Sequence, residues 1–304
     1  MRIASTQYSA TMNQALQLAN SHMADLMQQM ATGQRILKPS DEPVTSVRLS
    51  RLEREDAALS QYRDNIGALR TRLTKNESLM EGMNKDMQQV RDLLVWAADN
   101  GGNSNADVAA MASSLSALRD SLYYSVNSRD DEGHYLFSGT ASDKATVTFN
   151  AAGAAGSRYA FGGNTNPQLV MVGNGVTQAA NVSLDEMATL LNQLDSTIAI
   201  LQAPGLDISA PATQSSIRGS LDMVDSTMSS VTAKIAQQGG AQNTLQSLDD
   251  SHANVSLSNQ QAALTLGQLD YGKAAVELNG YTIAVQATQK VYGRVSQLSL
   301  FDAL

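Results

Sequence analysis

Cysteine is absent from this chain of 304 residues, and both proline and aromatic residues are scarce. Without cysteine there can be no disulfide, no thiolate zinc site and no cysteine nucleophile. Only 5 prolines interrupt the chain and aromatic residues make up 5% of it, so long helices are favoured over a thick globular core. This composition fits a cytosolic protein, or an exported protein that travels unfolded and without cross-links.

Long hydrophobic runs and an excess of basic residues are also missing. Residues 1–19 lack the continuous apolar stretch of a signal peptide, and no segment approaches the roughly 18 apolar residues of a membrane span. The formal net charge is −8, whereas nucleic-acid backbones select clustered Lys and Arg. We therefore expect neither a membrane nor nucleic acid as a partner, and no use of the general secretion signal if the protein is exported.

Heptad spacing begins near the N-terminus. Apolar residues separated alternately by four and three positions form a coiled-coil seam, which consists of Met12, Leu16, Ala19, Met23, Leu26 and Met30. The seam ends at Thr32-Gly33, and the segment 38–43 then breaks the helix. Ser40 or Asp41 is predicted to cap the next helix, with Pro43 in its first turn.

That next helix is predicted to be the most regular part of the chain. Asn76 is the polar member of its seam and is predicted to fix the register of the helix against its partner. The helix is expected to end near residues 100–103, and a shorter one follows with Val108, Met111, Leu115, Leu118 and Leu122 on one face. The long seam consists of Leu52, Leu59, Tyr62, Ile66, Leu69, Leu73, Asn76, Met80, Met83, Met87, Val90 and Leu94.

Short β-prone runs replace the helical spacing between residues 131 and 182. Gly-rich turns separate four such runs, at 135–137, 146–149, 159–161 and 169–172. The sequence therefore predicts a small β domain inserted between two helical halves.

Helical spacing returns in the second half. A helix is predicted from Leu184 to Leu201, and a long one from Ile217 that passes Gly239-Gly240, a candidate hinge. The last seam consists of Ala274, Leu278, Tyr281, Val285, Thr288, Tyr292 and Val295. Because the halves mirror each other, we predict a mainly α fold: a long antiparallel helical coiled-coil rod with a small inserted β domain. The expected segments are 1–40 (N-terminal assembly helix), 41–130 (first half of the rod), 131–182 (β domain), 183–262 (second half of the rod) and 263–304 (C-terminal assembly helix).

The two terminal seams have few turns that could fold them back on the rest of the chain. Fixing their backbones costs more free energy than their few seam side chains recover by burial. One interpretation is that the ends become ordered only within an assembly. The alternative is that they pair within the monomer as an ordinary bundle, and the residues alone favour neither.

No catalytic constellation is found in the sequence. The histidines His22, His134 and His252 are far apart, and the acidic residues beside His134 lack a calcium-loop pattern, so a solvated loop explains them better than a metal site. The Gly-rich stretch 153–163 lacks the Lys-Ser/Thr of a phosphate loop, and no serine lies in a nucleophile elbow. We therefore predict no catalytic, cofactor-binding or metal site, and a protein that is not an enzyme.

Both ends of the chain resemble flagellin. Residues 26–43, LMQQMATGQRILKPSDEP, are similar to the N-terminal flagellin motif, in which a seam helix leads into a Thr-Gly-x-Arg-Ile element and an acidic turn. Residues 240–245 and 269–274 resemble patterns of flagellin's C-terminal helix. The similarity covers both termini in the same order, about half of the chain.

The resemblance to the flagellin family implies a structural subunit of the bacterial flagellum that is exported unfolded through the type III channel. Its two terminal seams would form the assembly interface and become ordered on assembly. Within the family, the turn at 38–43 and the motif at 133–140 favour a subunit that joins the hook to the filament, outside the cell. The implied partners are further copies of the chain, hook-associated protein one, flagellin and a cytoplasmic export chaperone, with no cofactor. The alternatives are a short flagellin that polymerises alone and a secreted coiled-coil adhesin whose ends fold without partners.

Overall fold

The computed structural model describes residues 2–99 and 104–301, which form two compact units. Unit 1 is built from the two ends of the chain, up to Ala58 and from Asn254 onward, and unit 2 is Leu59–Ala253. Within the described residues, no helix is long and apolar enough to cross a membrane. The units are described in turn, because each has its own core.

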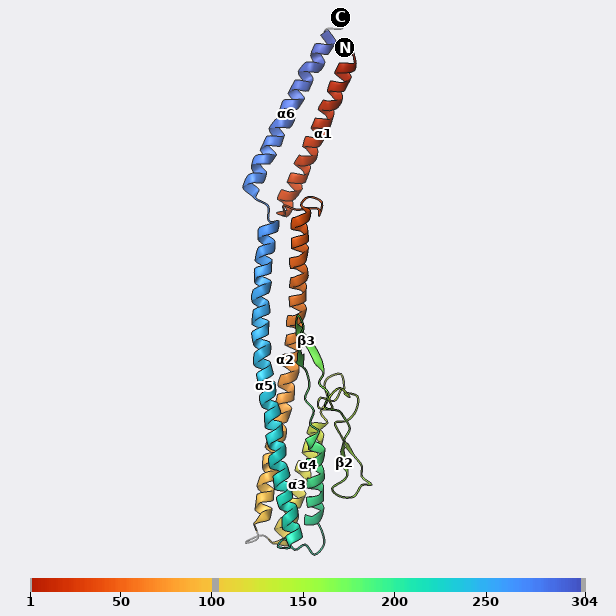
Figure 1. Cartoon of the computed structure of the whole chain (residues 1–304), viewed down its shortest axis with the longest axis vertical. Coiled ribbons are helices and arrows are strands. Elements are labelled where there is room, and N and C mark those ends of the chain that lie inside the picture. Colours follow the sequence, from red (N-terminus) through yellow and green to blue (C-terminus); the bar gives the residue numbers. More distant parts are fainter. Residues whose placement is uncertain (1, 100–103, 302–304) are drawn as a thin grey trace. The chain divides into compact units, whose positions relative to one another are not determined.

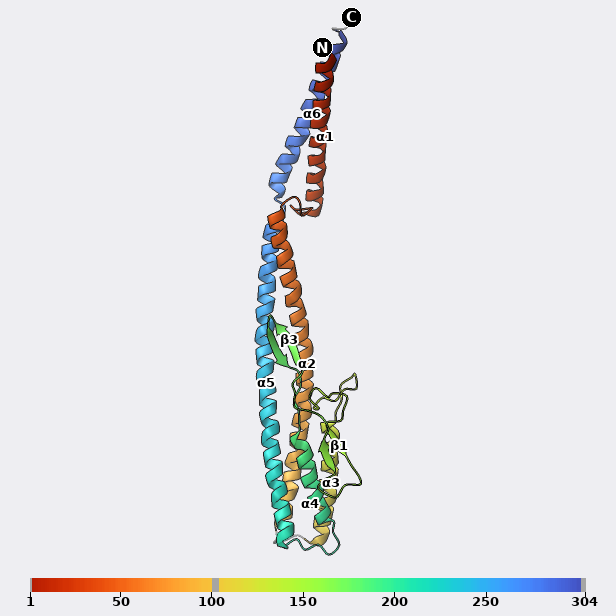
Figure 2. The same cartoon turned by 45° about the vertical axis from the view of Figure 1, so that its right-hand side comes forward.

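Unit 2 is organised by two long helices, α2 (Pro43–Ala98) and α5 (Pro211–Gly267), which also contribute their outer ends to unit 1. The shorter helices α3 (Asn105–Val126) and α4 (Glu186–Leu201) join them in a bundle (Figures 1 and 2). The heptad prediction for α2 is confirmed, because its seam from Leu59 to Leu94 faces the core, with Tyr62 partly buried. α2 ends at Ala98, and the predicted end at 100–103 lies outside the described residues.

Polar contacts show that α2 and α5 are antiparallel, as predicted. The Arg63 guanidinium pairs with the Asp249 carboxylate at 2.9 Å, and Arg91 pairs with Asp225 at 2.7 Å. Arg91 follows Arg63 along α2, whereas its partner Asp225 precedes Asp249 along α5, so the two helices run in opposite directions. The exposed ion pairs contribute little stability, and the seam between them holds the helices together.

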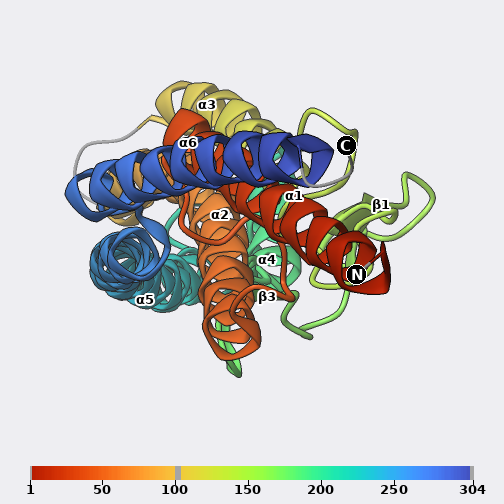
Figure 3. The same cartoon turned by 90° about the horizontal axis from the view of Figure 1, so that it is seen from above.

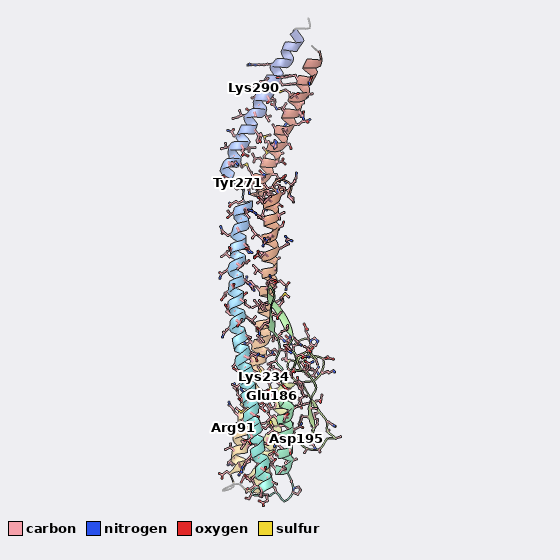
Figure 4. The ribbon with its side chains drawn as sticks, in the orientation of Figure 1. Arg91, Glu186, Asp195, Lys234, Tyr271 and Lys290 are labelled. Carbon is pink, nitrogen blue, oxygen red and sulfur yellow. The ribbon has the colours of Figure 1, made fainter. Side chains whose placement is uncertain are left out.

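A partly buried lysine joins α4 to α5. The Lys234 ammonium lies 2.6 Å from a carboxylate oxygen of Glu186 and donates a hydrogen bond of 2.7 Å to the Ser183 carbonyl oxygen (Figure 4). Its charge is therefore satisfied by both the first turn of α4 and the chain just before it.

The inserted β structure consists of two separate antiparallel hairpins. The strands β1 (Val147–Phe149) and β2 (Tyr159–Phe161) pair with each other, as do β3 (Leu169–Gly173) and β4 (Val176–Ala179). The prediction of strands near 146–149, 159–161 and 169–172 is confirmed. The prediction at 135–137 is wrong, because Leu136 and Phe137 are buried in the helical core and only a single bridge, Arg129 to Tyr135, forms there. Strand β4 was not predicted.

The run Gly133–Thr140 forms the turn that starts the insert. Gly139 has φ +71°, and a Cβ atom on it would lie 2.0 Å from the Asn164 carbonyl oxygen. The close approach allows the Asn164 N–H to donate to the Ser138 carbonyl oxygen at 3.0 Å. A glycine is needed here because both the backbone conformation and the space exclude a larger residue.

Two asparagine side chains attach the β1–β2 hairpin to the helices. Each bonds to the backbone N–H and C=O of one strand residue, as a neighbouring strand would. The Asn192 amide of α4 accepts from the Tyr159 N–H at 2.8 Å and donates to the Tyr159 carbonyl oxygen at 2.7 Å. Asn127 makes the same pair of bonds with the backbone of Val147, at 3.0 and 2.9 Å. Viewed from above, this hairpin lies outside α3 and α4 (Figure 3).

A buried carboxylate completes this attachment. Asp195 of α4 is 2% exposed, lies 2.9 Å from Arg119 and 3.4 Å from Arg158, and accepts the Gly156 N–H at 3.1 Å (Figure 4). It therefore connects α3, α4 and the loop between β1 and β2 through one charge.

The second hairpin rests on the two long helices. The side-chain amide of Asn65 donates to the Met171 carbonyl oxygen at 2.8 Å, and a ring nitrogen of His252 lies 2.8 Å from the Val172 carbonyl oxygen. Val172 is buried in a small cluster with Ile66 of α2. These contacts occupy carbonyl groups of β3 that would otherwise be unpaired.

The histidine of the acidic turn is part of a backbone turn. Asp130 accepts the N–H groups of Glu132 and His134 at 3.0 and 2.8 Å, and the His134 ring is exposed beside these carboxylates. Among the described residues, no group of three or more acidic or histidine side chains could hold a metal ion.

Candidate assembly interface

The two ends of the chain pair with each other in unit 1. The helices α1 (Arg2–Thr32) and α6 (Tyr271–Phe301) run side by side and antiparallel (Figures 1 and 2). The rings of His22 and Tyr281 stack with their centroids 5.6 Å apart, and the Tyr271 hydroxyl donates to the Met30 carbonyl oxygen at 3.2 Å. The residues of the two predicted seams are therefore brought together within one chain.

Most predicted seam residues lie between α1 and α6. Leu26 and Ala274 are buried, and Tyr292 is exposed at 36%. Val295 belongs to α6, but its side chain lies outside the described residues. The partly buried members of the seam are Met12, Leu16, Ala19, Met23, Met30, Leu278, Tyr281, Val285 and Thr288.

This seam is much less buried than the core of unit 2. The buried residues here are Leu26 and Ala274 of the seam and Leu269 just before α6, with Met30, Leu278 and Tyr281 packed against them. Free energy from apolar burial scales with the area removed from water, so this pair gains little for the length of backbone that it fixes.

A backbone joint connects the end of α1 to the loop between α5 and α6. Gly33 ends α1 with φ +71°, and its carbonyl oxygen accepts the Leu269 N–H at 3.0 Å. The Arg35 N–H donates to the Gly267 carbonyl oxygen at 2.8 Å, and its guanidinium donates to the Leu266 carbonyl oxygen at 2.8 Å. Arg35 thus satisfies carbonyl groups that the end of α5 leaves unpaired. The Thr-Gly-x-Arg-Ile element of the sequence is this joint.

The loop after the joint is fixed by its acidic residues. The Asp41 carboxylate accepts the N–H groups of Leu37 and Lys38 at 3.2 and 2.9 Å, so it stabilises the loop before α2 where a cap of α2 was predicted. Glu42 directly precedes Pro43, the first residue of α2, and pairs with Arg35 at 2.8 Å. Pro43 lies in the first turn of α2, as predicted.

We expect Gly33→Ala to weaken this joint. An alanine at φ +71° costs about 1–2 kcal/mol, and its methyl group would lie 3.1 Å from the Tyr271 hydroxyl. In the assembled protein, where the ends are ordered, hydrogen exchange of the Leu269 amide should therefore accelerate by about tenfold. Gly280→Ala is the control, since a Cβ there meets nothing within 4 Å and the helix tolerates it. Unchanged exchange at Leu269 in Gly33→Ala would show that the joint does not depend on the glycine.

A second apolar face on α6 was not predicted. Val276, Ile283 and Val291 are 74%, 57% and 46% exposed and recur at intervals of seven and eight residues. By helical spacing, Val276 and Ile283 lie opposite the seam and Val291 lies at its edge. The interval of seven residues is visible in the sequence, but the longer seam on the same helix has the same period and conceals it. An exposed apolar stripe of this kind is typical of a helix that contacts further partners.

A groove also lies within unit 1. It has a volume of about 930 Å³ and is formed by the loop 33–39, the start of α2 and the end of α5. Leu49 and Leu264 contribute apolar surface to it, and Leu264 is 61% exposed. Its lining holds one acidic side chain, Glu53, and one basic one, Lys38.

Unit 2, with its long antiparallel helices and β insert, and the paired terminal helices of unit 1 are together the features of a flagellin-like helical subunit. The family model of the bacterial flagellin N-terminal helical region matches residues 3–142. A solved structure of a flagellar hook-associated protein from Vibrio parahaemolyticus is 33% identical, with a TM-score of 0.66, and the match covers 74% of this chain and 99% of that one.

Curated relatives match over most of the chain. Flagellar hook-associated protein 3 of Escherichia coli K12 is 26% identical over 293 residues, which cover 90% of each chain. The protein of the same name from Salmonella typhimurium LT2 is 25% identical over 293 residues and 91% of each chain. The chain therefore belongs to the flagellin family, in the group of flagellar hook-associated protein 3.

Proposed function

We propose that this protein is a structural adapter that joins the flagellar hook to the filament. The observation that carries the proposal is the match to hook-associated protein 3 along nearly the whole chain, together with paired ends of the flagellin type. A solved structure of the flagellar junction protein from Legionella pneumophila shares this fold, at 12% identity and with a TM-score of 0.55. The role is mechanical and needs no catalytic site.

The seam residues and the outer face of α6 would have different tasks in the assembly. The seam, which includes Leu26 and Leu278, holds α1 against α6 within the chain. The outer stripe of Val276, Ile283 and Val291 would contact neighbouring copies, because its apolar surface is otherwise left in water. The thin seam supports the interpretation that both helices become fully ordered only when neighbours cover the outer stripe.

The remaining partners follow from the position between hook and filament. The chain would be exported unfolded through the type III channel, with its C-terminal seam covered beforehand by a cytoplasmic chaperone. Outside the cell it would assemble on hook-associated protein one and then present flagellin with a matching surface. A chain without cysteine suits this route because no disulfide can form before export.

Hydrogen exchange of the purified monomer, followed by an attempt at self-polymerisation, tests the proposal. We expect residues 1–38 and 263–304 to exchange freely, residues 50–95 to be protected, and no filament to form. Electron microscopy should then detect the chain bound to hooks that carry hook-associated protein one, and flagellin should extend only such hooks. Growth of filaments from the chain alone would instead identify a short flagellin. Protected ends in the monomer would contradict ordering on assembly.

A further inference from the structure

The core of unit 2 is divided into two clusters along the α2–α5 pair. One cluster contains Ile66, Leu69 and Leu73 of α2 with Leu245 of α5. The other begins at Met80 and continues to the far end of the bundle. Of the α2 seam, only Asn76 lies between the two clusters.

Two buried amides occupy the gap between the clusters. Asn76 is 0% exposed and Gln238 of α5 is 5% exposed. Both side-chain polar atoms of each residue are buried without a hydrogen-bond partner among the described residues. Burial without a partner is costly for an amide, which satisfies its donors and acceptor fully in water.

The register of the helices places the two amides at the same level. The Gln242 side-chain amide donates to the Glu77 carboxylate at 2.7 Å, and Asn84 donates to the Thr232 hydroxyl at 3.1 Å. Asn76 of α2 and Gln238 of α5 both lie between the Arg63–Asp249 ion pair and the Asn84–Thr232 contact, at about the same distance along the two antiparallel helices. They therefore form one polar layer across the pair.

The helix α5 is also less stable at the level of these two amides. Gly239 and Gly240 follow Gln238 directly, and a Cβ atom on either would meet nothing within 4 Å. The helix continues through them, so the candidate hinge of the sequence lies within a continuous helix. Glycine lowers helix stability because the unfolded backbone has more freedom to lose, and here no side chain compensates by packing.

We propose that this level is a compliant joint, at which the α2–α5 pair opens before the hydrophobic segments on either side. Opening here hydrates two unpaired amides and exposes little apolar surface, whereas opening at Leu69 or Met83 exposes buried hydrocarbon. The layer therefore gives unit 2 a defined point of bending between two stiff segments. The inference concerns the mechanics of the purified chain and does not depend on the function proposed above.

Hydrogen exchange by residue on the full-length monomer is the test. In the unmodified chain we expect amides 238–243 to exchange about tenfold or more faster than amides 224–231 of the same helix. Equal protection of the two segments would overturn the proposal.

The double variant Asn76→Leu/Gln238→Leu should slow exchange at 238–243 by about tenfold and raise the melting temperature by about 2–4 °C, since it replaces unpaired amides by hydrocarbon. Gln214→Leu is the matched control. Gln214 is a buried glutamine of the same helix, but its side-chain amide donates to the Ile208 carbonyl oxygen at 2.9 Å, so this variant should lower the melting temperature. A loss of stability in the double variant would mean that Asn76 and Gln238 satisfy each other and would overturn the proposal.

Gly239→Ala/Gly240→Ala provides a second route that leaves the amides unchanged. Both positions have room for a methyl group, so this variant should fold and should also slow exchange at 238–243. If it leaves exchange unchanged, the glycines do not contribute to the joint, and the proposal in this form is wrong.

Discussion

Replacing Asp195 with alanine is expected to lower the free energy of unfolding of unit 2 by about 1.5–3 kcal/mol, because it removes the buried acidic partner of the partly buried Arg119. Arg119 is 15% exposed and keeps only the more exposed Asp120 as an acidic partner once Asp195 is removed. Burial by itself would lower the pKa of Arg119, but its hydrogen bond to Asp120 and the nearby acidic charges raise the pKa instead, so the arginine stays charged. The charge must then be hydrated, and the hairpin loop at Gly156 loses its acceptor.

Chemical denaturation monitored by circular dichroism measures this loss. Asp120→Ala is the matched control, because that carboxylate contacts the same arginine but is half exposed, and we expect it to cost less than about 1 kcal/mol. A cost for Asp195→Ala no larger than that of the control would show that water replaces the carboxylate without penalty. Asp195→Asn separates charge from shape, and we expect an intermediate loss.

Leu278→Asp is expected to abolish attachment of the chain to the hook while unit 2 stays folded. The leucine packs against the buried residues between α1 and α6, and a carboxylate there would be desolvated without a cation. The cost exceeds about 1.4 kcal/mol, so the hook-bound fraction should fall more than about tenfold in a co-sedimentation assay. Any loss of helicity in the monomer should be confined to the terminal helices α1 and α6.

Gln286→Asp is the control for this experiment, since the same charge is introduced at an exposed position of α6. Val276→Asp places the charge on the outer stripe, and we expect it also to block attachment, without an effect on α1–α6 pairing. Normal attachment of Leu278→Asp would refute the role of the seam. Normal attachment of Val276→Asp would refute the role proposed for the outer stripe.

The helices could be predicted from the sequence because their heptads are long and unbroken. Met80, Met83 and Met87 recur at the spacing of a helical seam, and all three are fully buried against the bundle. The antiparallel pairing followed from the mirrored halves, and Asn76 was recognised as a polar member of the seam. Its counterpart Gln238 was not, because a single glutamine on a polar helix carries no periodic signal.

The insert was harder to predict for a physical reason. Tyr135–Phe137 has the composition of a strand, but Leu136 and Phe137 gain more by entering the helical core than by pairing in a sheet. Strand β4 is short and mixed in polarity, and its partner β3 supplies the pairing that defines it. The outer stripe of α6 was missed because the seam of Leu278 and Tyr281 beside it carries the same period.

The asparagine clamps at Asn127 and Asn192 give the β1–β2 hairpin unusual freedom of sequence. They hold the hairpin through main-chain atoms of Val147 and Tyr159, so they place no demand on the exposed side chain of Ala160. The Thr148 hydroxyl, in contrast, donates to the Ala160 carbonyl oxygen at 3.1 Å and helps to hold the two strands together. Ala160, on the outer surface of the hairpin, can therefore be replaced while the hydrogen bonds that attach the hairpin to the helices are kept. A binding peptide or a reporter label attached at Ala160 should be displayed on a fixed support, which would make this insert a practical platform for engineered surfaces.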